Sequence, residues 1–235
     1  MSALLEVEGL TAAYGRAQVL FDVSLALHRG EVVALMGRNG AGKSTTLKAI
    51  MGLIPRAARR LVFAGQDIAG LASHRIARLG LGYVPEDRRI FTDLTVAENL
   101  EVGRQPARGR AAWTPERLFA IFPNLAEMRG RRASEMSGGE QQMLTIARTL
   151  MGNPEAVLLD EPSEGLAPVI VELMADAVLA MKREGIAVLL SEQNLVFASA
   201  ISDRATIIER GHIRYEGTIA ALSADAAVRE AYLTV

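Results

Sequence analysis

The chain has 235 residues, half of them apolar, with a formal net charge of −1 and no cysteine. This length suits one domain, or one domain with a subdomain, and the apolar content is ample for a buried core, so intrinsic disorder is excluded. A net charge near zero provides no positive field to gather nucleic acid or an acidic membrane surface. The absence of cysteine excludes disulfides, thiolate metal sites and a cysteine nucleophile.

No targeting or membrane-spanning segment is visible in the sequence. Residues 1–6 lack the basic region and apolar core of a signal peptide. No apolar run approaches the roughly 18 residues needed to cross a bilayer. If the protein serves transport, we therefore expect other chains to form the pore.

The N-terminal part of the sequence has the patterns of β-strands around one helix. Alternating apolar and polar residues predict antiparallel strands at 5–14 and 19–27, and the continuous apolar run at 32–36 predicts a buried strand. A helix-compatible run begins at Ser44 and ends near Gly52. We then expect an edge strand at 61–63, a small helix around 74–79, and a short strand at 81–84 that Pro85 stops.

Helices replace strands between residues 86 and 153. We expect them at 95–102, 114–122 and 139–151, the first two opening with Thr at or near the cap position. The loop at 103–112 contains Pro106, Gly109 and three arginines, and we expect it to be mobile.

Strands return in the last third of the chain. Residues 156–159 and 186–190 are apolar on both faces, as central parallel strands are, and an amphipathic helix is expected between them at 169–183. Two further strands, 205–209 and 213–216, bracket a turn and precede short helices. The pattern predicts an α/β fold with an antiparallel β layer. It is a single domain, 1–235, with an inserted α-helical subdomain at approximately 87–153.

A glycine-rich segment joins the buried strand at 32–36 to the helix that follows. Glycine permits backbone conformations in which consecutive N–H groups turn inward around phosphate oxygens at a helix N-terminus. Lys43 would reach the β- and γ-phosphates, and the hydroxyl of Ser44 would bind Mg²⁺. The alternative is a chance glycine-rich turn. We call this segment the phosphate loop; its residues are Gly37, Arg38, Asn39, Gly40, Ala41, Gly42, Lys43, Ser44 and Thr45.

Two carboxylates follow the strand at 156–159. Asp160 would lie beside Mg²⁺, and Glu161 a step further toward the γ-phosphate, where it can orient water as general base. Acidic residues are common after strands, so the phosphate loop carries much of the weight of this interpretation.

A capping-box pattern opens the helix at 139–151. Ser137 stands at the cap and Glu140 three residues later. The simple interpretation is a well-capped core helix, but two glycines in its first turn weaken a helix and leave bare N–H groups that a phosphate could approach. We call this the signature segment; its residues are Ser137, Gly138, Gly139, Glu140 and Gln141.

Three motifs in this order, GRNGAGKST at 37–45, SGGEQQ at 137–142 and LLDEP at 158–162, resemble the ATP-binding subunit of an ABC (ATP-binding-cassette) transporter. The resemblance covers the whole chain and implies a P-loop NTPase fold that binds ATP with Mg²⁺. It also implies that two subunits meet head to tail, with Ser137, Gly138 and Gly139 contacting the γ-phosphate held by the opposite subunit. Tyr14 would be the adenine platform, although a strand-end Tyr is as often simply half buried.

Three positions depart from the general pattern of that family. Glu86 replaces the usual Gln, Ala167 the usual Asp, and Gln193 the usual His. Together they resemble one branch, the second ATPase subunit of branched-chain (hydrophobic) amino-acid importers. Urea and short-amide importers have a close relative of this subunit. The branch also implies no regulatory domain after Val235.

These replacements are chemically tolerable. Glu86 is still an oxygen ligand for a hard cation, so the implied metal ligands are Ser44, Glu86 and Asp160. Gln193 keeps an amide donor for the γ-phosphate but cannot become a cation, and with Glu161 it completes the implied catalytic pair.

The resemblance also implies partners and a place in the cell. These are a second ABC ATPase subunit, as a heterodimer or a homodimer in isolation, two membrane-spanning permease subunits and, indirectly, a periplasmic or extracellular solute-binding protein. No nucleic acid is expected. The chain would lie at the cytoplasmic face of the cell membrane, held by the permease. The alternatives are a soluble non-transport ABC ATPase, and a P-loop kinase or GTPase, in which nothing calls for the glycine pair after Ser137.

Overall fold

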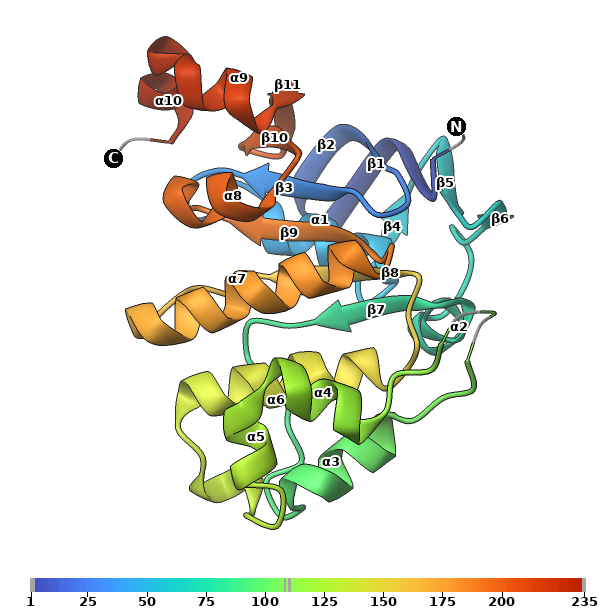
Figure 1. Ribbon diagram of the computed structural model, residues 1–235. Helices are drawn as coiled ribbons and strands as arrows, with labels where there is room; N and C mark the ends of the chain where they lie inside the picture. Colours follow the sequence, from blue (N-terminus) through green and yellow to red (C-terminus); the bar gives the residue numbers. More distant parts are fainter. Residues whose placement is uncertain (1–2, 108, 110, 234–235) are drawn as a thin grey trace.

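Two β-sheets organise the computed structural model, which describes residues 3–107, 109 and 111–233 (Figure 1). The antiparallel sheet has the order β2-β1-β5-β6, with β4 also paired to β1. Its strands are β1 (Leu5–Tyr14), β2 (Ala17–Leu27), β4 (Arg56–Ala57), β5 (Arg60–Phe63) and β6 (Gln66–Asp67). The expected antiparallel pairing is confirmed, with Leu5 opposite Leu27. The strand at 61–63 is not an edge, because β5 pairs with both β1 and β6.

The second sheet is parallel except at one end and has the order β11-β10-β3-β9-β8-β7. Its strands are β3 (Val32–Met36), β7 (Leu81–Val84), β8 (Ala156–Asp160), β9 (Ala187–Glu192), β10 (Arg204–Glu209) and β11 (His212–Thr218). The parallel strands confirm the prediction from their continuous apolar runs. Val33 and Leu35 of β3 face one hydrophobic core, whereas Val32, Ala34 and Met36 face the other. Both faces are therefore covered, as parallel sheets require.

Helices cover the two faces of this parallel sheet. α1 (Lys43–Ile50) contributes to the core shared with the antiparallel sheet. α7 (Pro168–Arg183) and α8 (Leu195–Ile201) contribute to the core on the other face. The remaining helices outside the 86–153 segment are α2 (Ser73–Leu79), α9 (Ile219–Ala224) and α10 (Ala226–Tyr232). The sequence patterns did not indicate α8, whose seven residues are too few to show a clear period.

The helices between β7 and β8 lie together at the bottom of Figure 1. Thr95 and Thr114 cap the first two as predicted. The five-residue α5 was not predicted, and its preceding residue belongs to the α4 pattern. Two arginines of the 103–112 loop, at positions 108 and 110, lie outside the described residues. The helices of this segment are α3 (Val96–Gly103), α4 (Pro115–Ile121), α5 (Pro123–Glu127), the short 3-10 helix Ala133–Glu135 and α6 (Gly138–Leu150).

Strand register brings the predicted catalytic segments to one edge of the parallel sheet. Met36 pairs with Glu192, and Asp160 with Ser191. Because the carboxyl ends of parallel strands meet at the same edge, the phosphate loop after β3, Glu161 after β8 and Gln193 after β9 become neighbours.

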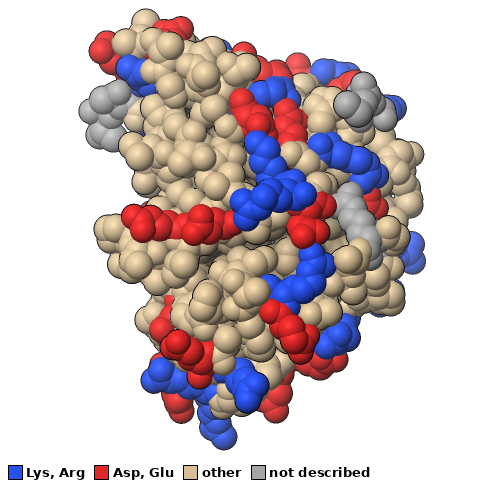
Figure 2. Space-filling view, in the orientation of Figure 1, with Lys and Arg blue, Asp and Glu red and all other residues tan. Residues whose placement is uncertain are grey.

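The surface mixes charges of both signs on the face shown in Figure 2. Ion pairs such as Arg117 with Glu184 (2.8 Å) and Lys182 with Asp203 (2.6 Å) follow the same mixed pattern. In the part of the chain that the structure describes, no helix is both long and apolar enough to cross a membrane.

Candidate functional site

The phosphate loop ends in a helix start that has no side-chain cap. Gly42 is the N-cap of α1 and has φ +115, a left-handed conformation that favours glycine. The helix begins at Lys43, one residue before the predicted start. Because Gly42 has no side chain that could accept from the first N–H groups of α1, these donors and the positive end of the helix dipole suit an anion.

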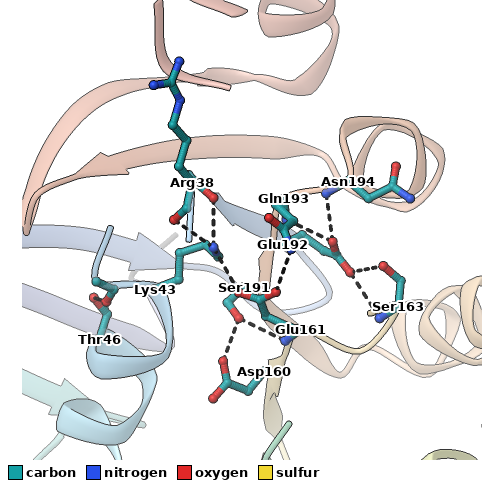
Figure 3. Close-up of polar contacts among 12 residues, drawn as sticks. Arg38, Lys43, Thr46, Asp160, Glu161, Ser163, Ser191, Glu192, Gln193 and Asn194 are labelled. Atoms are coloured by element: carbon teal, nitrogen blue, oxygen red, sulfur yellow. Dashed lines mark hydrogen bonds and ion pairs between the residues drawn. The ribbon is translucent and has the colours of Figure 1, made fainter. Parts of the chain in front are cut away.

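Lys43 is a buried cation held by three oxygens (Figure 3). Its Nζ lies 2.8 Å from the Gly37 carbonyl oxygen, 3.2 Å from that of Arg38 and 3.0 Å from Glu161 Oε1. The Lys43 and Glu161 side chains are 3% and 7% exposed. A phosphate that reaches this ammonium group therefore competes with the Glu161 carboxylate.

Glu161 lies between the phosphate loop and Gln193. Its Oε2 accepts a hydrogen bond of 3.4 Å from Gln193 Nε2. Its backbone has φ +46, which non-glycine residues adopt only where the surroundings hold them. Here the Glu161 N–H donates to the Ser191 hydroxyl (3.0 Å) and the Ser191 carbonyl (3.2 Å). The structure thus brings together Lys43, Glu161 and Gln193, as the sequence predicted for the site.

Asp160 is fully buried beneath this arrangement. Its Oδ1 accepts from the Ser191 hydroxyl (2.8 Å) and its Oδ2 from the Tyr83 hydroxyl (3.0 Å). Burial, and then the negative charge of Asp160, raise the pKa of Tyr83, so Tyr83 stays protonated as the donor. Sequence analysis missed Ser191 and Tyr83, because their contacts follow from strand register and not from a motif.

The oxygen groups of the three predicted ligands fit Mg²⁺ better than they fit a metal held wholly by protein. Ser44 is half-buried on the first turn of α1, Asp160 is buried, and Glu86 is exposed after β7. Among the described residues, no group of three acidic or histidine side chains could hold a metal ion. Mg²⁺ typically takes one or two carboxylates and completes its shell with phosphates and water. The three predicted ligands therefore suit the ion in type, and their role stays a prediction.

A pocket of about 230 Å³ adjoins Glu161 and contains an unpredicted acidic residue. Glu86, Arg88 and Glu164 are among its lining residues. A hydrogen bond with Glu161, then burial and the charges of Glu161 and Glu86, raise the pKa of Glu164 to about 7. Sequence analysis did not assign Glu164 a role. Its place three residues after Glu161 was the one available signal.

The signature segment forms the predicted capping box at the start of α6. The Glu140 N–H donates to the Ser137 hydroxyl (3.4 Å), and Glu140 Oε2 accepts from the Ser137 N–H (2.7 Å). Gln141 Nε2 donates to the carbonyls of Ala133 and Met136, each at 3.2 Å. The local geometry is therefore confirmed, and the contact with a phosphate stays a prediction.

Close packing gives a second reason for one of the two glycines of the signature segment. A Cβ on Gly139 would lie 3.0 Å from the Ile170 side chain, whereas the nearest atoms to Gly138 belong to the guanidinium of Arg88, the flexible end of a side chain that can move aside. Sequence analysis explained these glycines only by bare N–H groups. The structure adds that the Ile170 side chain lies tightly against Gly139.

The other predicted site residues differ in how exposed they are. Tyr14 ends β1 and is 47% exposed. Ala167 is the N-cap of α7 and, being alanine, gives it no side-chain cap. In the phosphate loop, Arg38, Asn39 and Gly40 are exposed, Ala41 is buried and Thr45 is half-buried.

Known proteins match this chain over nearly its whole length. A family model described as ABC transporter matches residues 20–164. The chain is 42% identical to the high-affinity branched-chain amino acid transport ATP-binding protein BraG of Pseudomonas aeruginosa, over 98% of this chain and 99% of BraG. It is 35% identical to the lipopolysaccharide export system ATP-binding protein LptB of Escherichia coli, over 98% of this chain and 97% of LptB.

A solved structure agrees with these matches in fold and ligand. The ADP conformation of an ATP-binding cassette of an ABC transporter superposes with a TM-score of 0.81 at 27% identity, covering 98% of each chain. The mixed α/β architecture is therefore that of a P-loop ATP-binding cassette. On this family match and these relatives, the chain belongs to the ABC transporter family as an ATP-binding protein with ATPase activity.

Proposed function

We propose that this protein is the ATP-hydrolysing subunit that energises a membrane importer of branched-chain amino acids. The observation that carries the hydrolytic role is the Glu161 carboxylate, held between Lys43 Nζ at 3.0 Å and Gln193 Nε2 at 3.4 Å. The similarity to BraG supports the solute class, because that relative is a branched-chain amino acid transport protein.

The proposed reaction uses groups already gathered at the edge of the parallel sheet. Free N–H groups at the start of α1 and the Lys43 ammonium bind the β- and γ-phosphates. Glu161 orients a water molecule for in-line attack and accepts its proton, and Gln193 donates its amide N–H to the γ-phosphate. Ser44, Glu86 and Asp160 would hold Mg²⁺, which neutralises phosphate charge when bound. When a phosphate replaces Glu161 as the partner of the Lys43 ammonium, the Glu161 carboxylate becomes available to hold the attacking water.

The signature segment is proposed to serve a nucleotide bound by a second ATPase subunit. In Figure 1 the helices of the 86–153 segment, α6 included, lie apart from the phosphate loop, which follows β3 in the upper half of the view. Among the described residues, the Ser137 hydroxyl takes part in only one hydrogen bond, a long one of 3.4 Å, so this group can be redirected to a phosphate. Head-to-tail closure of two subunits, either a heterodimer or a homodimer, would complete each site.

The permease contact is proposed at an apolar groove of about 540 Å³. Residues of α2, β7, α3 and α6 line it, among them the exposed Val102 (53%), together with the exposed Phe91 (48%) from the segment between β7 and α3. Exposed large apolar residues that share one hollow indicate a partner surface. This groove contains part of the segment near 90–104 through which we expect nucleotide-driven motion to reach two membrane-spanning subunits. A solute-binding protein would act through those subunits, with this chain on the cytoplasmic side.

Two other transport roles are alternatives to import of branched-chain amino acids. The 35% identity to LptB shows that a related cassette serves an export system. The branch resemblance at Glu86, Ala167 and Gln193 favours an importer, of branched-chain amino acids or of urea and short amides.

Uptake by cells that lack this gene tests the proposal. We expect loss of labelled leucine, isoleucine and valine uptake, and restoration by the parent chain but not by Glu161→Gln. Glu172→Gln, a matched change on an exposed position of α7, should restore uptake.

Unchanged leucine uptake with loss of urea uptake would reassign the solute. Normal uptake with Glu161→Gln would refute the role of this carboxylate. Co-purification of the tagged parent chain should identify the permease subunits.

A further inference from the structure

Glu192, a buried carboxylate that the proposed reaction does not use, joins two loops beside the catalytic pair (Figure 3). It ends β9 and is 2% exposed. Its Oε1 accepts hydrogen bonds from the hydroxyl and the backbone N–H of Ser163. Its Oε2 accepts from the backbone N–H groups of Gln193 and Asn194, both at 3.0 Å. One side chain therefore ties the loop after Glu161 to the loop that carries Gln193.

The carboxylate depends on these four donors. Among the described residues, no cationic side chain forms an ion pair with Glu192. Burial raises its pKa, and the hydrogen bonds from Ser163, Asn194 and Gln193 act in the opposite direction. Burying an unpaired charge opposes folding, and an apolar side chain could fill the same space without that cost. The presence of a carboxylate at residue 192 is therefore better explained by the two loops that it connects than by packing.

Both loops determine how Glu161 and Gln193 meet. Ser163 follows Glu161 by two residues, and Gln193 is adjacent to Glu192. The 3.4 Å separation of Gln193 Nε2 and Glu161 Oε2 is near the upper limit for a hydrogen bond, so a small shift of either loop breaks it. Asn194 also caps α8 by accepting from the Val196 and Phe197 N–H groups, which anchors the second loop to a helix.

We propose that Glu192 is a positioning residue for ATP hydrolysis. By holding Ser163 and the N–H groups of Gln193 and Asn194 on one carboxylate, it sets the distance between the water-orienting carboxylate and the amide that contacts the γ-phosphate. This inference rests on the proposed function, because it takes Glu161 and Gln193 as the reacting pair. A purely structural role for Glu192 would instead predict loss of stability without a selective loss of turnover.

The test compares steady-state ATP hydrolysis by full-length variants, each assembled with its partner subunits so that the shared site is complete. Glu192→Gln should lower kcat about 10- to 100-fold, because it misplaces the reacting groups, while KM for ATP changes little. Ser163→Ala removes one hydroxyl donor and should lower kcat about two- to ten-fold, and Ser163→Thr should restore it. Asp203→Asn is the matched control, since Asp203 accepts from Val32 N–H (2.9 Å) at the opposite edge of the sheet. It should lower the Tm but leave kcat unchanged.

The outcomes separate this inference from the proposed function. Parent-like kcat in Glu192→Gln overturns the positioning role, as does a Ser163→Thr variant no faster than Ser163→Ala. If Glu192→Gln does not fold, the two Ser163 variants decide. A parent complex that hydrolyses no ATP refutes the proposed function instead. In that case amide hydrogen exchange tests whether Glu192 holds the two loops together. Faster exchange of the Gln193 and Asn194 amides in Ser163→Ala supports the connection, and unchanged exchange overturns it.

Discussion

Two helix N-termini, those of α1 and α6, are built in opposite ways in this protein. The start of α1 has no side-chain cap, and the buried Lys43 beside it contacts Glu161 from a distant part of the chain. The start of α6 is capped by its own first turn, through Ser137 and Glu140. The first is ready for a phosphate within one subunit. At the start of α6 the Ser137 hydroxyl already accepts a hydrogen bond from the Glu140 N–H. The proposed contact with a phosphate of a second subunit must therefore replace this weak bond of 3.4 Å.

The largest expected effect comes from removing Lys43, the buried cation at the start of α1. Lys43→Ala leaves the Glu161 carboxylate buried without its cation, which should destabilise the fold by about 3–5 kcal/mol and abolish nucleotide binding. Lys182→Ala is the matched control, because Lys182 pairs with Asp203 at 2.6 Å but both side chains are more than a third exposed. Its expected cost is about 0–1 kcal/mol. Urea unfolding measures both. Equal losses would show that burial of the Lys43 pair has no energetic consequence.

Changes at Gln193 test whether the site needs a hydrogen-bond donor to the γ-phosphate at this position, and whether a side chain that can carry a charge serves as well. Gln193→Ala should lower ATP hydrolysis while largely preserving ATP affinity, by about 1.5–3 kcal/mol of transition-state stabilisation, because it removes a donor to a charged group. Gln193→His should restore or exceed the parent rate and add a pH dependence near neutrality, since imidazole titrates there. ATPase rate against pH, in complexes assembled with partner subunits, measures this. Gln66→Ala, an exposed change on β6, is the control. An Ala variant that equals the parent would make Gln193 a bystander.

Ser137 tests the self-capped helix start. Ser137→Ala should cost about 1 kcal/mol of folding stability through loss of the cap. Thr95→Ala is the matched control, because Thr95 and Glu98 form the same capping box on α3. Thermal unfolding should show similar losses for both variants, whereas ATP hydrolysis by assembled subunits should fall only with Ser137→Ala. Equal loss of hydrolysis in the two variants would place Ser137 outside the shared site.

Glu164 gives the smallest expected effect and tests the electrostatics beside Glu161. Its pKa in the fold, about 7, exceeds the ordinary value of 4.5. The stabilisation from this group is therefore complete below pH 4.5 and is lost as pH rises through 7. Urea unfolding midpoints across this range should fall more steeply for the parent than for Glu164→Gln. Parallel curves for the two proteins would refute the raised pKa.

Local patterns were enough for the features built from neighbouring residues. The capping boxes follow from side chains three residues apart, so Ser137 with Glu140 could be placed before any tertiary contact was known. The parallel strands followed from apolar runs, and the phosphate loop from glycines between a strand and a helix. Short elements without a clear period, such as α5 and α8, could not be found in this way.

The sequence alone determined which chemical groups this protein has and the order in which they occur along the chain. Only the tertiary structure decided which of them meet. Strand register set Asp160 beside Ser191, and Met36 beside Glu192. The physical reason is that a hydrogen bond within one helical turn is fixed by local geometry. A contact between parallel strands depends instead on register, where a shift of one residue turns every side chain to the other face.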